Sequence, residues 1–204
     1  MKIISKKKTI KNKIILIGCG GHAKVCADLI LNNNKYQIVG FVCSEKKNTN
    51  LPIIGTDKEL KEIRKKYKYA LIGVGQIKDS TIRRRIFNNL KKLNFTLPVI
   101  KSKDSLISNN TKVDEGTIIM DGAIIRPDVK IGYNSIINTK VIIEHDVEIG
   151  NNTHISTGVI VNGNVKIGNN VFIGSGSIIV NNIKIKSNSF IKAGTTIKEN
   201  FWKR

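Results

Sequence analysis

Two histidines in the C-terminal half of the chain stand in surroundings suited to acyl transfer. His145 lies in the segment Ile-Glu-His-Asp, next to the carboxylates of Glu144 and Asp146, and His154 follows nine residues later. Histidine is the natural general base near neutral pH, and a carboxylate beside it orients the ring and stabilises its protonated form. An amine that attacks a thioester needs such a base, because an ammonium group must lose a proton before it becomes a nucleophile.

The elements that must position these histidines form a repeat with a period of six residues. Every sixth residue from 107 to 197 is Ile or Val, over 16 consecutive hexads. The anchor positions are Ile107, Val113, Ile119, Ile125, Ile131, Ile137, Ile143, Ile149, Ile155, Val161, Ile167, Ile173, Ile179, Ile185, Ile191 and Ile197. A period of six fits neither a helix nor a hairpin meander. It predicts a solenoid of short strands, with three hexads per coil and the anchors pointing inward.

The coil length of 18 residues predicts what surrounds each histidine. His145 is the third residue of its hexad, at or near a corner, and the residue one coil later is Gly163. We therefore expect an opening beside the imidazole for an acyl group, with a backbone N–H free to stabilise an oxyanion. His154 is half a coil from His145, so the two rings should lie on opposite sides of the solenoid. A site that uses both needs His154 from a neighbouring subunit.

The N-terminal half alternates strands with helices, which predicts a parallel sheet. Strands are expected at 13–17, 37–43 and 69–73, and helices at 23–31, 57–66 and 81–93. Gly18, Gly20 and Gly21 form a turn between the first strand and the first helix, where backbone N–H groups bind phosphate well. The dinucleotide fingerprint is incomplete, because no acidic residue closes the second strand. A tight turn without a ligand is the alternative interpretation of these glycines.

Composition narrows the possible classes of protein. No apolar run approaches the roughly 18 residues that a membrane helix needs, and the abundance of Ile and Val argues against disorder. The first residues are charged and lack a continuous apolar stretch, so they do not resemble a secretory signal. Three cysteines, at Cys19, Cys26 and Cys43, make no disulfide framework and favour a reducing cytosol. We therefore expect a cytoplasmic protein without a membrane partner.

The net charge of +20 is concentrated in one half of the chain. Residues 1–106 hold 24 basic and 7 acidic side chains, a net charge of +17, whereas residues 107–204 are close to neutral at +3. A nucleic-acid binder would need aromatic residues among the basic ones, but aromatics make up only 5% of the chain. Attraction of a substrate's phosphates, or a compositional bias toward Lys, also accounts for the excess. We therefore expect no nucleic-acid partner.

With both halves placed, the chain resembles a family of bacterial sugar acetyltransferases. The family includes N-acetyltransferases of nucleotide-linked 4-amino-sugars and sialic acid O-acetyltransferases. The resemblance rests on the loop Gly18–Lys24, on Ile72-Gly73 with the basic segment 82–85, on Asn138-Thr139, on Glu144–Asp146 with His154–Ser156, and on Asn162–Val165. It covers nearly the whole chain, and it departs from the family at the end of the second strand, where Cys43-Ser44-Glu45 stands in place of the usual acidic residues.

The resemblance implies a two-domain fold and a trimer. An α/β Rossmann-like domain at residues 1–106 would bind the nucleotide-sugar. A left-handed parallel β-helix of hexapeptide repeats at residues 107–204 would bind acetyl-CoA. The family forms homotrimers with active sites between adjacent β-helices, which agrees with the half-coil separation of the two histidines.

The resemblance also assigns roles to particular residues. The catalytic residues are His145 as general base and Asp146 as its orienting partner. Acetyl-CoA, the cosubstrate, is assigned to His154, Gly163 and Gly174. The nucleotide-sugar is assigned to Gly18, Gly20, Gly21, His22, Lys24, Gly73 and Arg83. Solvated or purely structural roles remain the alternatives for the histidines and the basic residues. No metal is expected, since the histidines are too far apart to share a tetrahedral ligand set within one subunit.

The sequence therefore predicts transfer of an acetyl group from acetyl-CoA to the amino group of a nucleotide-linked amino-sugar, of the 4-amino-4,6-dideoxy type. The reaction would proceed by direct attack, because no cysteine in the repeat is available for an acyl-enzyme. O-acetylation of a sialic-acid-like sugar is the alternative. The glycine loop and the basic domain favour a phosphorylated substrate and hence the first interpretation.

Overall fold

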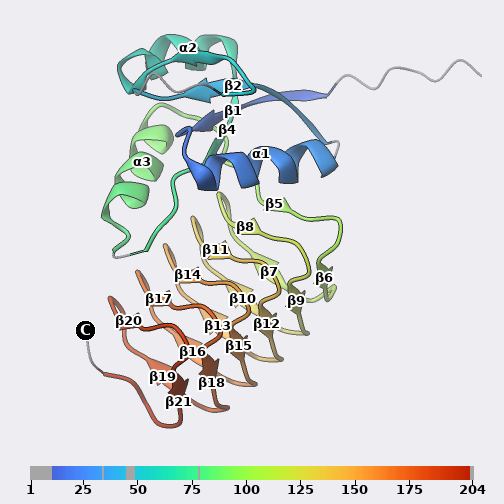
Figure 1. Ribbon diagram of the computed structural model, residues 1–204, viewed down its shortest axis with the longest axis vertical. Coiled ribbons are helices and arrows are strands. Elements are labelled where there is room, and N and C mark those ends of the chain that lie inside the picture. The colour runs from blue at the N-terminus through green and yellow to red at the C-terminus, as the bar shows by residue number, and fades with distance from the viewer. Residues whose placement is uncertain (1–10, 34, 45–48, 78, 203–204) are drawn as a thin grey trace, which may run out of the picture.

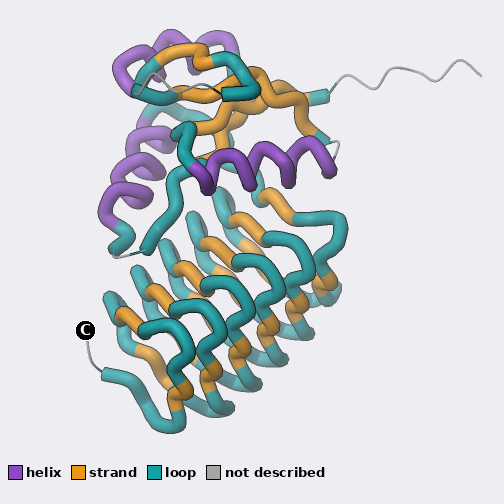
Figure 2. The backbone as a smooth tube through the Cα atoms, in the orientation of Figure 1, coloured by secondary structure: helices purple, strands orange, loops and turns teal. Residues whose placement is uncertain are grey.

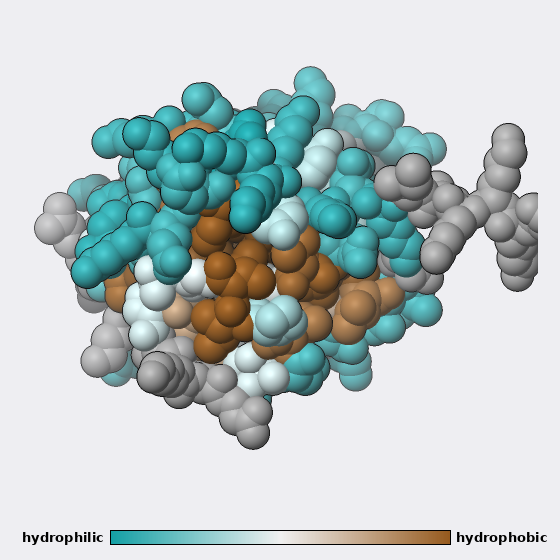
Figure 3. Space-filling view, turned by 90° about the horizontal axis from the view of Figure 1, so that it is seen from above, coloured by the Kyte–Doolittle hydropathy of each residue, from teal (hydrophilic) through white to brown (hydrophobic). Residues whose placement is uncertain are grey.

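The chain folds into an α/β domain that stands on one end and side of a long solenoid (Figure 1). The computed structural model describes residues 11–33, 35–44, 49–77 and 79–202. Seen from above, hydrophilic residues surround a central hydrophobic area (Figure 3). None of the helices in the described ranges is long and apolar enough to span a membrane. The predicted fold class, an α/β domain followed by a hexapeptide-repeat β-helix, is confirmed.

The N-terminal domain is a four-stranded parallel sheet covered by helices on both faces. Its strands are β1 (Asn12–Ile17), β2 (Tyr36–Val42), β3 (Ile53–Gly55) and β4 (Tyr69–Ile72), in the order β3-β2-β1-β4. Its helices are α1 (Gly21–Asn33), α2 (Leu60–Lys66) and α3 (Thr81–Lys92), with the 3-10 turn η1 (Asp57–Glu59) before α2. The expected strands and helices are found at these places, and only the three-residue β3 went unpredicted.

The apolar run in β1 reflects burial of both faces of the sheet. Ile14 and Leu16 pack with α1 and with the first coils of the solenoid. Ile15 and Ile17 pack on the opposite face, against residues of α2 and α3. A strand buried on both faces reads as a continuous apolar segment, which is why the sequence indicated a parallel sheet. Helix α1 thus lies between the sheet and the solenoid (Figure 1).

The solenoid has 17 two-residue strands, separated by turns (Figure 2). Each strand pairs in parallel with the strand 18 residues later, as in Ile142 with Ile160. The domain face comprises β5 (Ile100–Lys101), β8 (Ile118–Ile119), β11 (Ile136–Ile137), β14 (His154–Ile155), β17 (Phe172–Ile173) and β20 (Phe190–Ile191). The aliphatic face comprises β6 (Leu106–Ile107), β9 (Ile124–Ile125), β12 (Ile142–Ile143), β15 (Ile160–Val161), β18 (Ile178–Ile179) and β21 (Thr196–Ile197). The charged face comprises β7 (Lys112–Val113), β10 (Lys130–Ile131), β13 (Glu148–Ile149), β16 (Lys166–Ile167) and β19 (Lys184–Ile185).

The six-residue period has a simple physical cause. The second residue of each strand from β6 onward is an anchor, and the anchors pack together in one core along the solenoid axis. Corners need residues that tolerate a left-handed backbone, and Asn, Asp and Gly occupy nearly all such positions. Asp146, with φ of 60°, is one of them. The corner geometry therefore places a carboxylate beside His145.

The solenoid begins one hexad earlier than the predicted domain boundary between residues 106 and 107. Strand β5 pairs with β8 and belongs to the domain face. The inward register position in β5 is Lys101, which pairs with the anchor Ile119. Because Lys101 is not apolar, the hexad pattern could not reveal this first strand.

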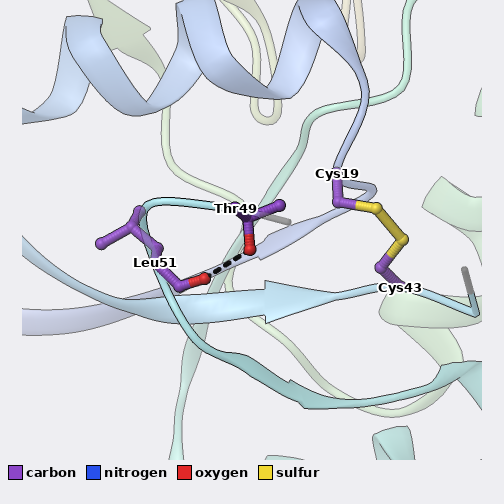
Figure 4. Close-up of a disulfide and its surroundings, with 4 residues drawn as sticks. All are labelled: Cys19, Cys43, Thr49 and Leu51. Carbon is purple, nitrogen blue, oxygen red and sulfur yellow. Dashed lines mark hydrogen bonds between the residues drawn. A yellow bond between two sulfur atoms is a disulfide. The ribbon is translucent and has the colours of Figure 1, made fainter. Parts of the chain in front are cut away.

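Two of the three cysteines are joined, which corrects the expectation drawn from their number. Cys19, in the glycine loop, forms a disulfide with Cys43, which follows β2 (Figure 4). Their Cα atoms are 5.9 Å apart, within the usual range for a disulfide. Cys26 is a buried free thiol. The pairing went unpredicted because the loop and the end of β2 meet only when β1 and β2 lie side by side.

The disulfide predicts a response to reductant. The bridge spans 24 residues, and closing a loop of that size stabilises a fold by about 3 kcal/mol. Dithiothreitol should lower the free energy of unfolding of the oxidised protein in urea titrations. Cys19→Ser should abolish this response, whereas Cys26→Ala should retain it. Three free thiols in the protein before reduction would contradict the pairing.

Candidate active site

His145 lies at the corner between β12 and β13, and its ring is exposed. Its Nδ1 is 2.7 Å from Oδ2 of Asp146. Because a carboxylate oxygen accepts, Nδ1 carries the proton of the neutral ring and Nε2 has a free lone pair. Glu144 instead pairs with Arg126 at 3.9 Å, so Asp146 is the carboxylate that orients the ring. This tautomer is the one that a general base requires.

Gly163 lies directly against the imidazole, one coil further along. A Cβ at this position would stand 2.8 Å from both Cε1 and Nε2 of His145, so any side chain would displace the ring. The Gly163 carbonyl accepts from Asn182, but among the described residues its N–H donates no hydrogen bond. An open depression of about 450 Å³ lies here, lined by His145, Asn162, Gly163, Asn164, Asn181 and Asn182. The site thus combines a base, an unused amide donor and room for an acyl group.

His154 is held beneath the N-terminal domain of the same chain. It lies in β14, where its Nδ1 donates to the main-chain carbonyl oxygen of Gln76. Asn138 donates from Nδ2 to Nε2 of His154 at 3.1 Å. Burial lowers the pKa of His154 to about 4. The ring is therefore neutral, with both nitrogens engaged by protein groups.

The structure separates the two histidines. His154 belongs to the domain face, while His145 lies at the opposite corner, between the aliphatic and charged faces. Gly174 follows β17 of the domain face, and a Cβ there would lie 2.3 Å from the backbone nitrogen of Ala193. Of the three residues assigned to acetyl-CoA, only Gly163 adjoins His145 within one chain. One subunit therefore does not bring the predicted acetyl-CoA residues together.

A cleft opens in the N-terminal domain around the glycine loop. Two adjoining cavities, of about 740 and 650 Å³, share Gly18, Cys43, Val74 and Ile82 in their walls. Gly18 has φ of 96° and turns the chain from β1 toward α1. A Cβ on Gly20 or Gly21 would meet nothing within 4 Å, so the space beside the start of α1 is open. This is the arrangement that suits a phosphate at a helix N-terminus.

The remaining residues assigned to the nucleotide-sugar have different surroundings. His22 and Gly73 line the smaller cavity, and their contact with substrate stays a prediction. Burial, together with the nearby Arg83 cation, lowers the pKa of His22 to about 3, so the ring is neutral. Gly73 allows β4 to pass close to α1, since a Cβ would lie 2.8 Å from that of Ala23. Lys24 is exposed on α1 and lines neither cavity.

Arg83 does not fit its predicted contact with substrate. It is 1% exposed, and its guanidinium donates to backbone carbonyls of both domains. The acceptors are the carbonyl oxygens of Ile72 and Val74 at 2.8 Å, of Asn134 at 3.1 Å and of Gly116 at 3.4 Å. Burial lowers the pKa of Arg83 to about 10, which leaves it charged near neutral pH. Its role in this arrangement is to join the domains.

The basic residues that do line the cleft come later in α3. Arg84, Arg85 and Lys92 lie in the wall of the larger cavity, together with Asp57 of η1. Arg85 and Lys92 are seven residues apart, two helical turns, which places them on one face of α3. That spacing was available in the sequence. In contrast, no local pattern indicated Gln76. This residue lines the smaller cavity, and its main-chain carbonyl oxygen accepts a hydrogen bond from His154.

Comparisons with known proteins agree with both halves of the fold. Residues 13–90 match the PglD N-terminal domain, and residues 164–199 match the bacterial transferase hexapeptide, which comprises six repeats. No curated protein matches the sequence significantly. The resemblance to bacterial sugar acetyltransferases, drawn from the sequence, is thereby confirmed. Among the described residues, no group of three or more His, Cys, Asp and Glu is arranged to hold a metal ion.

Several solved structures share the fold over nearly the full chain. The acetyltransferase domain of PglB from Neisseria gonorrhoeae, in complex with acetyl coenzyme A, is 28% identical with a TM-score of 0.85, covering 94% of this chain and 93% of that one. A mutant of GDP-perosamine N-acetyl transferase from Caulobacter crescentus, in complex with CoA and GDP-perosamine, is 22% identical with a TM-score of 0.87, covering 93% and 90%. WeeI from Acinetobacter baumannii is 18% identical with a TM-score of 0.83, covering 94% and 93%.

The burial of Arg83 predicts that Arg83 supports the fold, whereas Arg85 contributes to substrate binding. Arg83→Met leaves several buried carbonyl groups without a donor and should lower the free energy of unfolding by about 3 kcal/mol or more. Arg85→Met, at the cavity wall, should change stability by less than about 0.5 kcal/mol but weaken binding of a nucleoside diphosphate. Urea denaturation and calorimetric titration measure the two effects. An Arg83→Met protein of normal stability that no longer binds the diphosphate would restore the substrate assignment.

Proposed function

We propose that this chain, which joins a PglD-type N-terminal domain to a hexapeptide-repeat transferase domain, transfers the acetyl group of acetyl-CoA to a nucleotide-linked amino-sugar. The observation that carries the proposal is the His145–Asp146 pair facing the backbone of Gly163. The similarity to an acetyltransferase domain crystallised with acetyl coenzyme A supports the same donor here. The proposed sugar is of the 4-amino-4,6-dideoxy type. The cytoplasm is the proposed location, although the Cys19–Cys43 disulfide removes the cysteine count as an argument for it.

His145 acts as the general base in this reaction. Asp146 accepts from Nδ1 and stabilises the ring once it becomes an imidazolium. The free lone pair of Nε2 takes a proton from the sugar amine as the amine attacks the thioester carbonyl carbon. The Gly163 N–H, which donates no hydrogen bond within the described residues, donates to the carbonyl oxygen, which becomes an oxyanion in the tetrahedral intermediate. When the C–S bond breaks, the proton held by His145 neutralises the departing thiolate of CoA.

The cleft of the N-terminal domain binds the second substrate, the nucleotide-linked amino-sugar. The glycine loop and the start of α1 receive the diphosphate, and Arg84 and Arg85 add positive charge to the wall of the larger cavity. The excess of basic residues in this half raises the local concentration of anionic substrates. A nucleotide-linked substrate therefore suits the cleft better than a free sialic-acid-like sugar.

An assembly of several chains completes the site. The outward residues of the aliphatic face form a stripe of Leu106, Ile124, Ile142, Ile160 and Ile178, and Leu106 is 68% exposed. The outward residues of the charged face are Lys112, Lys130, Glu148, Lys166 and Lys184. Exposed aliphatic ladders mark protein interfaces, whereas charged ladders face water. His145 lies at the edge of the aliphatic face, so a homotrimer joined there places it beside a neighbouring subunit.

Removing the base should abolish most of the activity. His145→Ala should lower kcat by about 10²- to 10⁴-fold, the usual contribution of a general base, with little change in the KM of acetyl-CoA. Asp146→Asn should give a smaller loss. Coenzyme A release, measured with UDP-, dTDP- and GDP-linked amino-sugars and with sialic acid, identifies the acceptor. Full activity of His145→Ala would exclude the proposed base, and release only with sialic acid would favour O-acetylation.

A charged side chain on the aliphatic face should dissociate the proposed trimer. Ile160→Lys buries a cation in the proposed interface and should convert a trimer into monomers, with loss of acetyl transfer. Lys184→Ala on the charged face is the matched control and should leave both mass and activity unchanged. Light scattering coupled to size-exclusion chromatography measures the mass. An active wild-type monomer would contradict the shared site.

A further inference from the structure

Gln76 connects the cleft to the solenoid through three hydrogen bonds. It follows β4 in the segment that leads to α3, and it is 3% exposed. Its side-chain Nε2 donates to the carbonyl oxygens of Asn152 at 3.0 Å and Val171 at 3.4 Å, both on the solenoid. Its main-chain carbonyl oxygen accepts a hydrogen bond from Nδ1 of His154. The side chain is therefore held in one orientation by the body of the protein.

This orientation leaves an acceptor without a donor. The described residues contain three buried side-chain atoms with no hydrogen-bond partner, namely Nε2 of His22, Oε1 of Gln76 and Oδ1 of Asn134. His22 and Gln76 line the same cavity of about 650 Å³. The Gln76 amide is not free to flip, because its oxygen would then face two carbonyl oxygens. Buried polar atoms in proteins are nearly always paired, so two unpaired atoms on residues that line one cavity indicate a polar partner bound there.

The position of Gln76 indicates which part of the substrate it meets. The residues that line the larger cavity come from α3, the ends of β1 and β2 and the region of η1, and no described residue of the solenoid is among them. Gln76 lines the smaller cavity and is hydrogen-bonded to the solenoid. The proposed acetyl donor binds on a solenoid, so the sugar must point toward this cavity and the nucleoside away from it. Gln76 is therefore placed at the sugar, and the diphosphate at the glycine loop.

We propose that Gln76 is a specificity-determining residue, whose Oε1 accepts a hydrogen bond from a hydroxyl or amino group on the sugar ring, beside His22 Nε2. This inference rests on the proposed function and adds a recognition group for the sugar itself. A site with a fixed, buried acceptor discriminates strongly against a ligand that lacks the matching donor, because the acceptor is then left unpaired. The Asn152 and Val171 carbonyls hold the acceptor in place without touching the substrate.

The test compares two ligands on one variant. Gln76→Met keeps a side chain of similar length but removes the acceptor. We expect it to weaken binding of the nucleotide-linked amino-sugar by about 10- to 100-fold, while binding of the matching nucleoside diphosphate changes less than about twofold. Ser80→Ala is the matched control: Ser80 also joins this segment to the solenoid, through Asn170 at 3.1 Å, but lines neither cavity. It should leave both affinities unchanged.

Sugar analogues locate the donor. A nucleotide-sugar that lacks one ring hydroxyl, or carries hydrogen in place of the amine, should bind the wild type about 10- to 100-fold more weakly if the missing group is the donor. Gln76→Met should then bind this analogue no more weakly than it binds the complete amino-sugar. Equal weakening of both ligands by Gln76→Met would make its role structural and overturn the proposal, as would unchanged binding of both. The amino-sugar used is the one that supports coenzyme A release, so failure of the proposed function would appear in that earlier assay.

Discussion

The buried guanidinium of Arg83 holds the two halves of this protein in register. One side chain donates to carbonyls of β4 and the segment after it, at Ile72 and Val74, and to carbonyls of the solenoid, at Gly116 and Asn134. A buried cation is costly unless its donors are satisfied, and here backbone oxygens of both domains satisfy them. Any rotation of one domain against the other would break some of these hydrogen bonds and leave the buried charge without acceptors. The relative position of cleft and solenoid is therefore tightly specified.

That position decides what becomes of the segment after β4. Gln76 reaches the solenoid in the region where Arg83 also joins the two domains, and its main-chain carbonyl oxygen fixes the tautomer of His154. His154, fully engaged within the fold, differs in this respect from His145, which is exposed and paired only with Asp146. The two histidines, alike in sequence, thus serve different purposes. His154 is held between the two domains, and His145 is the proposed general base.

The repeat produces three chemically different surfaces from one local rule. Inward positions are nearly all Ile or Val, but the outward position differs on each face, since residues 18 apart stack on one another. Isoleucines, phenylalanines and His154 line the domain face, aliphatic side chains line a second face, and lysines with a glutamate line the third. The same stacking sets Gly163 against His145. The core, the proposed interface and the proposed catalytic opening therefore all follow from the 18-residue coil.

The sequence by itself determined the features that depend on spacing. The hexads predicted the solenoid, and adding one coil length to position 145 predicted the glycine beside His145, because a solenoid converts sequence distance directly into spatial distance. The apolar runs likewise predicted the strands of the N-terminal sheet. Only the tertiary structure decided the pairing of Cys19 with Cys43, the burial of Arg83, the unpaired oxygen of Gln76 and the first coil at Lys101. These features arise from contacts between segments with no fixed spacing in the chain, so no local pattern encodes them.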